Sequence, residues 1–122
     1  MSLKVYEYKT CSTCVKATKF LDQKKVKYER VAIVDQPPTI AELKKMLAHI
    51  KEDGGSFKNL FNTSGLVYRE QKIGDKIKAG MTEADALQLL SKNGKLIKRP
   101  FALSEKSGTV GFKEPEWKKL FT

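Results

Sequence analysis

The sequence predicts an α/β fold with a mixed sheet of four short strands. Three observations predict it: a strand-helix-strand order fills the first 34 residues, helical patterns fill the middle, and two further strands precede a closing helix. With 122 residues, 40% of them hydrophobic, the chain can bury one core and is short for two. There is no internal repeat or linker, so we expect one domain, residues 1–122, with a helical insertion at about 39–95.

The first three elements form a β-α-β unit. Residues 3–8 and 27–34 are rich in β-forming side chains, and each predicts a strand. Side chains recur at helical spacing from Val15 to Leu21, which predicts a helix over about 12–24. A single helix that joins two strands is typical of a parallel pair.

The middle of the chain has the pattern of helices. Thr39 follows a pair of prolines and can cap a helix whose apolar stripe runs to Ile50. Thr82 opens a capping-box-like start, and Asn93-Gly94 ends the helix that follows. Between these helices we expect three smaller elements: a helical turn at 57–61, a turn at 62–65 and a short helix over 66–76.

The last quarter changes to a β pattern. Residues 96–103 lead into a third strand with Pro100 at its start, and residues 109–112 read as a return strand. Together they predict a β-hairpin. Pro115 suits the first turn of a closing helix that carries Trp117.

Composition excludes several classes of protein. The net charge of +10 is spread evenly over the two halves of the chain, which favours anionic partners without selecting one. No apolar run approaches the ~20 residues that span a bilayer, and no signal peptide opens the chain, so we expect a cytoplasmic protein without a membrane partner. Aromatic residues do not interleave with a basic stripe, so we do not expect direct nucleic-acid binding.

The only two cysteines, Cys11 and Cys14, stand where the first strand gives way to the helix. They are too few for a disulfide-rich secreted scaffold. With the sole histidine, His49, they make three ligands where a structural zinc site uses four, so we expect no metal and no bound cofactor. A Cys-x-x-Cys pair near a β-α-β pattern indicates redox chemistry. The alternative is that the two cysteines are buried or incidental and have no chemical role.

The position of the pair assigns a role to each sulfur. The free N–H groups and the dipole at a helix N-terminus stabilise a thiolate at Cys11. Cys14 lies one turn further on the same face, within reach of a disulfide. We therefore expect Cys11 to attack a target and Cys14 to resolve the mixed disulfide, while the small Ser12 and Thr13 leave the turn open.

A second candidate element is Arg99-Pro100, at the start of the third strand. A cis proline there would suit a tight functional turn, and in this topology the turn would lie beside Cys11. Arg99 could bind an oxyanion or favour the thiolate. An ordinary strand-starting proline beside a solvated arginine is the alternative. The predicted substrate-binding residues are Thr10, Ser12, Thr13, Arg99 and Pro100.

Five motifs occur in order along the chain: Thr10-Cys11-Ser12-Thr13-Cys14, Leu60-Phe61-Asn62-Thr63-Ser64-Gly65, Tyr68-Arg69, Ile97-Lys98-Arg99-Pro100-Phe101 and Val110-Gly111-Phe112. Together they resemble the arsenate reductase-like family, which includes the Spx-type transcription regulators. The resemblance covers nearly the whole chain and implies a thioredoxin-like fold with a helical insertion between the second and third strands. It also implies a nucleophile at Cys11 and an arginine before a cis proline at Arg99-Pro100.

The resemblance implies two functions. The first is a thiol-dependent oxidoreductase that reduces an oxyanion or a disulfide and is restored by an external thiol reductant, either glutathione with glutaredoxin or thioredoxin. Asn62 and Lys113 stand near places where arsenate reductases of this type carry further arginines, while Cys14 indicates an internal disulfide. The alternative is a redox-sensing regulator that binds the α subunit of RNA polymerase, since Glu52-Asp53-Gly54 and the cysteine pair also look like Spx.

Overall fold

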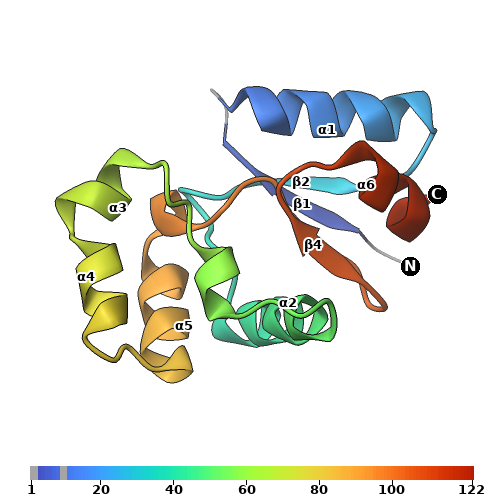
Figure 1. Cartoon of the computed structure of the whole chain (residues 1–122). Helices are drawn as coiled ribbons and strands as arrows, with labels where there is room; N and C mark the ends of the chain where they lie inside the picture. The colour runs from blue at the N-terminus through green and yellow to red at the C-terminus, as the bar shows by residue number, and fades with distance from the viewer. Residues whose placement is uncertain (1–2, 9–10) are drawn as a thin grey trace.

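A four-stranded mixed sheet forms the centre of the computed structural model, which describes residues 3–8 and 11–122. The strand order is β2-β1-β3-β4, with β1 and β2 parallel and the other neighbours antiparallel. This order confirms the predicted α/β fold and its thioredoxin-like arrangement (Figure 1). The strands are β1 (Lys4–Glu7), β2 (Glu29–Ala32), β3 (Phe101–Leu103) and β4 (Gly108–Val110).

Helices cover both faces of the sheet. Two of them lie on one face and enclose a small core around Trp117, while α2 and the segments after it enclose a larger core on the other face (Figure 1). Trp117 is fully buried and its indole Nε1 donates to the Gly111 carbonyl at 3.0 Å. The helices are α1 (Ser12–Gln23), α2 (Ile40–Glu52), α3 (Leu66–Glu70), α4 (Ile73–Lys78), α5 (Glu83–Lys92) and α6 (Glu114–Phe121), with 3₁₀ turns η1 (Phe57–Leu60) and η2 (Gly94–Leu96).

Capping residues begin the helices where the sequence predicts. Thr39 and Glu42 form a reciprocal capping box at the start of α2, and Thr82 and Asp85 form another at the start of α5. Pro115 lies in the first turn of α6, where a missing N–H costs nothing. None of the helices in the described part of the chain combines the length and the apolar character that a membrane crossing requires.

Several predicted boundaries were wrong. All four strands are shorter than expected. A strand ends where its backbone pairing with the neighbouring strand ends, and this pairing covers fewer residues than the β-forming sequence patterns do. The helix expected over 66–76 is two helices, α3 and α4, because Lys72 takes a left-handed conformation with φ of 52° and turns the chain between them. The stretch that leads into β3 begins with the turn η2, which Asn93 caps.

The helical segment between β2 and β3 is closed at its base. The Asn62 N–H donates to the Leu96 carbonyl and the Lys98 N–H donates to the Leu60 carbonyl, both at 2.8 Å. Phe61 and Ile97 form an antiparallel bridge between these bonds, and both side chains are buried. We call residues 60–62 and 96–98 the paired segment; it leads directly to Arg99.

A half-buried carboxylate, Glu42, joins the sheet to α2. Glu42 accepts hydrogen bonds from the Tyr6 hydroxyl at 2.7 Å and from the Thr39 N–H at 3.1 Å, and Lys4 Nζ lies 3.4 Å away. Burial acts to raise the pKa of Glu42, but these three partners outweigh it and hold the pKa below its ordinary value of 4.5. Burial of Tyr6 and its hydrogen bond to the Glu42 carboxylate raise the pKa of the Tyr6 hydroxyl.

We predict that Glu42→Gln lowers the free energy of unfolding by about 1–2 kcal/mol at pH 7, because the charge-assisted bonds are lost. Since the folded-state pKa is depressed, this contribution is complete above the unfolded value of 4.5 and disappears as pH falls through the folded pKa. Urea unfolding of both proteins at pH 7 and pH 3 measures the difference. A difference that is the same at both pH values would contradict the prediction.

Candidate active site

Cys11 caps the N-terminus of α1. Its backbone is extended, and its Sγ accepts a hydrogen bond from the Cys14 N–H at 3.2 Å. The Cys11 N–H in turn donates to the Tyr8 carbonyl at 3.0 Å. The sulfur therefore occupies the position of a capping oxygen, where a backbone amide and the positive end of the helix dipole stabilise a negative charge.

The two sulfurs have unequal environments. Cys11 is half-buried, whereas Cys14 is only 2% exposed, and neither forms a disulfide. Burial raises the pKa of the Cys14 thiol above its ordinary value of 9.0, and a hydrogen bond to Cys11 raises it further. The Tyr8 backbone and the Arg99 charge act in the opposite direction. One sulfur is thus reachable from solvent, and the neighbouring one is covered and protonated.

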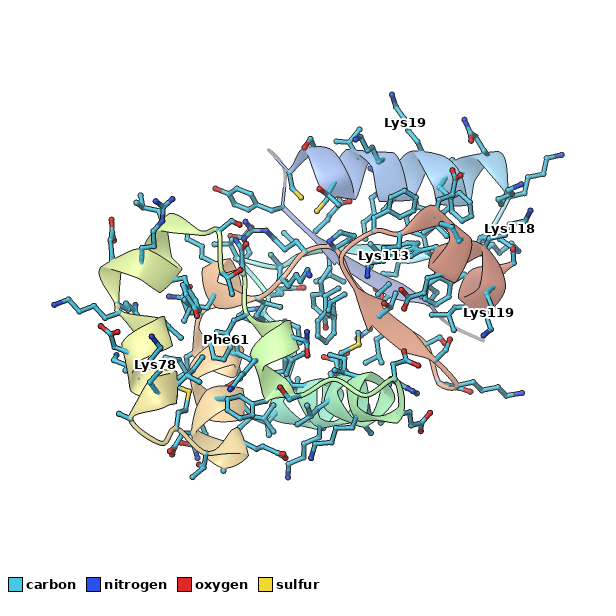
Figure 2. All side chains as sticks on the ribbon, in the orientation of Figure 1. Lys19, Phe61, Lys78, Lys113, Lys118 and Lys119 are labelled. Atoms are coloured by element: carbon cyan, nitrogen blue, oxygen red, sulfur yellow. The ribbon has the colours of Figure 1, made fainter. Side chains whose placement is uncertain are left out.

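A cavity of about 400 Å³ opens over Cys11; we call it the Cys11 cavity. Three cations line it, and no carboxylate is among its lining residues. Besides Cys11, the other lining residues are three neutral polar residues and the run Val110-Gly111-Phe112. Figure 2 labels Lys113 between β4 and α6. The cations and neutral polar residues are Lys98, Arg99 and Lys113, with Thr13, Asn62 and Ser64.

Distant parts of the sequence build this cavity. The paired segment brings Asn62 beside Lys98, and the Gly111 N–H donates to the Pro100 carbonyl at 2.9 Å, which holds the end of β4 against the start of β3. Gly111 has φ of +75°, a conformation that favours glycine, and an added Cβ would lie 3.1 Å from the Lys98 side chain.

Arg99 lines the same cavity as Cys11, as predicted, and the Arg99-Pro100 peptide bond is cis. The guanidinium Cζ lies 4.7 Å from the centroid of the Tyr8 ring, within the range of a cation–π contact. Within residues 3–8 and 11–122, no carboxylate lies within ion-pair distance of Arg99. Its charge is therefore available to an anion.

The structure brings most of the predicted residues together. Cys11, Thr13 and Arg99 line one cavity, with Cys14 buried behind Cys11 and Pro100 buried next to Arg99. Ser12 is exposed and does not line the cavity, because the first turn of α1 directs it elsewhere. Thr10 lies outside the described residues.

Sequence reasoning did not assign roles to Lys98, Ser64 or Tyr8. Lys98 stands next to Arg99, and Ser64 belongs to the motif Leu60-Phe61-Asn62-Thr63-Ser64-Gly65. Their place in these motifs was the signal in the sequence that could have marked them as cavity residues. His49 does not line the Cys11 cavity, and its ring lies against Gly108. No cluster of three metal-binding side chains occurs among the residues that the structure describes.

Comparison with known proteins gives similarities over nearly the whole chain. A model of the ArsC family matches residues 6–120. The uncharacterized protein YusI of Bacillus subtilis is 40% identical over 119 residues, which make up 98% of each chain. The crystal structure of an ArsC-family-related protein from Bacteroides fragilis has 43% identity and a TM-score of 0.89, with 98% of both chains covered. The global transcriptional regulator Spx of Enterococcus faecalis is 29% identical over 97% of this chain and 85% of its own.

Proposed function

This chain belongs to the ArsC family, and we propose that it is a thiol–disulfide oxidoreductase in which Cys11 attacks the substrate and Cys14 resolves the intermediate. The observation that carries the proposal is that the two sulfurs differ in exposure and in the protonation state that their surroundings favour. Cys11 accepts a backbone hydrogen bond at a helix N-terminus and opens into a cation-lined cavity. Cys14 is buried directly behind it, where its neutral form is favoured.

In the proposed reaction, the Cys11 thiolate attacks one sulfur of a substrate R–S–S–R′. A bond forms between Cys11 Sγ and the R-side sulfur, and R′S⁻ leaves and takes up a proton. Cys14 then loses its proton and attacks Cys11 Sγ, which forms the Cys11–Cys14 disulfide and releases RS⁻. Two electrons pass from the dithiol to the substrate.

The environment of Cys14 supports this order of events. Burial is the largest cause of the raised pKa of Cys14, and a hydrogen bond to Cys11 and the charge of Cys11 add to it. Once Cys11 is in a mixed disulfide, its sulfur carries no charge and the charge contribution is lost, whereas the opposing effect of Arg99 remains. Cys14 therefore becomes easier to ionise only after the first attack.

The cations of the cavity suit a negatively charged substrate or leaving group. Lys98, Arg99 and Lys113 attract an anion to Cys11 and stabilise the thiolate that leaves. An oxyanion such as arsenate is the other substrate class that this charge distribution favours. The oxidised pair needs two electrons from an external reductant, which we propose to be thioredoxin or glutathione with glutaredoxin in the cytoplasm.

A trapping experiment tests the proposal. We predict that Cys14→Ser, incubated with glutathione disulfide, gains the mass of one glutathionyl group on Cys11, because the mixed disulfide can no longer be resolved. The parent protein should instead lose two hydrogens as its internal disulfide forms. Intact-protein and peptide mass spectrometry measure both. Parallel samples with arsenate test the oxyanion class, and no modification of Cys11 by either reagent would contradict the proposal.

The similarity to Spx regulators favours a second candidate function, in which the same dithiol is a sensor and the partner is the α subunit of RNA polymerase. Two measurements distinguish the candidates: the affinity of the reduced and of the oxidised protein for purified α subunit, and the rate at which the protein reduces a disulfide substrate. Redox-dependent binding without turnover would favour the regulator, and turnover without binding would favour the enzyme.

A further inference from the structure

The aromatic ring of Tyr8 lies directly beneath the guanidinium of Arg99, with 4.7 Å between Cζ and the ring centroid. Tyr8 follows β1, is half-buried and packs against the larger core, so its ring is anchored. Its carbonyl also accepts the Cys11 N–H at 3.0 Å. A single residue thus contacts both the nucleophile's backbone and the cation beside it.

Arg99 borders two cavities, as Asn62 also does. It lines the Cys11 cavity, and it also lines a second cavity of about 240 Å³ whose wall includes Tyr8 and Leu66. Arginine has a long side chain with several rotatable bonds, and among the described residues no carboxylate holds this one. Without the ring, the guanidinium has space on the side away from Cys11.

We propose that Tyr8 is a positioning residue that holds Arg99 toward the Cys11 cavity, and that this pair makes Cys11 prefer negatively charged disulfides over neutral ones. The inference rests on the proposed attack by Cys11 and adds the residue that sets its substrate preference. The ring face attracts the guanidinium electrostatically and leaves its N–H groups free for an anion.

Two disulfide reagents separate this role from a structural one. Dithionitrobenzoate carries two negative charges, and 4,4′-dithiodipyridine is neutral at pH 7. Each forms a mixed disulfide with a thiolate and releases a product that is followed by its absorbance, in the visible for dithionitrobenzoate and in the near ultraviolet for dithiodipyridine. A Cys14→Ser background restricts the reaction to Cys11. We predict that Tyr8→Leu slows the reaction with dithionitrobenzoate by about threefold to tenfold and changes the rate with dithiodipyridine by less than about twofold.

The chain offers matched controls. Tyr8→Phe keeps the ring and should retain the preference. Tyr28 forms a similar cation–π contact, with Arg30 at 5.7 Å, outside both cavities, so Tyr28→Leu should change neither rate. Arg99→Gln should reduce the preference for dithionitrobenzoate over dithiodipyridine as much as Tyr8→Leu does. The double variant Tyr8→Leu/Arg99→Gln should reduce it no further. The preference of the parent should also weaken as salt is added.

Three results would overturn the inference or its premise, and they differ from one another. An equal loss of rate with both reagents in Tyr8→Leu would mean that Tyr8 supports the Cys11 backbone and not Arg99. Unchanged rates in Tyr8→Leu would mean that Arg99 does not depend on the ring. A Cys11 that reacts with neither reagent in the parent would contradict the proposed function itself.

Discussion

Cys11→Ser will abolish the reduction of disulfide substrates, with turnover lower by about three orders of magnitude or more, because an alkoxide cannot replace the thiolate as nucleophile. Serine is a favourable N-cap, so its hydroxyl can accept the Cys14 N–H that Cys11 Sγ accepts now. The helix should therefore stay folded, and the loss of turnover will reflect the missing nucleophile and not a misfolded protein. A coupled assay with thioredoxin and its reductase measures turnover, and circular dichroism checks the fold.

The comparison with Cys14→Ser makes the assignment of roles falsifiable. That variant should release one equivalent of thiol rapidly from a chromogenic disulfide and then stop when thioredoxin is the only reductant. The burst arises because Cys11 still attacks, and the stop arises because nothing displaces the mixed disulfide from within. If Cys11→Ser kept the burst and Cys14→Ser lost it, the buried sulfur would be the nucleophile.

Gly94→Ala will destabilise the fold by about 3 kcal/mol or more, the largest effect on stability that we expect from a single methyl group. Gly94 is buried at the start of η2, and a Cβ there would lie 1.9 Å from the Ile33 carbonyl oxygen and 2.6 Å from its carbon. Both atoms belong to the backbone, so no side-chain rotation can relieve the contact. Urea denaturation followed by circular dichroism measures the change.

Gly74→Ala is the matched control, because it adds the same methyl group to a glycine inside α4. Its Cβ would meet only the Tyr68 side chain, at 3.5 Å from the hydroxyl oxygen and 4.0 Å from Cε1, which are ordinary contacts. Alanine favours the helix over glycine by up to about 1 kcal/mol, so this variant should be as stable as the parent or more so. Equal destabilisation of the two variants would contradict the steric explanation for Gly94.

The sequence was sufficient for features that depend on local chemistry. Thr82 with Asp85 marks a capping box that depends only on residues three apart, and the structure contains it. Cys11 and Cys14 could be placed at a helix start in the same way, because the strand before them and the periodicity after them are both local.

Features that depend on packing between distant residues were not predictable. Asn93-Gly94 reads as a helix stop, and nothing local shows that Gly94 must admit the Ile33 carbonyl. Likewise, the ring of Tyr8 meets Arg99 across a separation of 91 positions that only the folded chain closes. Lys72 takes its left-handed turn where the sequence pattern continues as a helix.

The paired segment has a consequence for how proteins of this fold diversify. It brings the two ends of the region from Thr63 to Lys95 side by side, and chain stretches with adjoining ends can be lengthened, shortened or replaced at small entropic cost. Leu66 belongs to that exchangeable stretch, while Cys11 and Arg99 lie outside it. The stretch can therefore change in length and sequence while the cysteine pair and Arg99 keep their places in the fold.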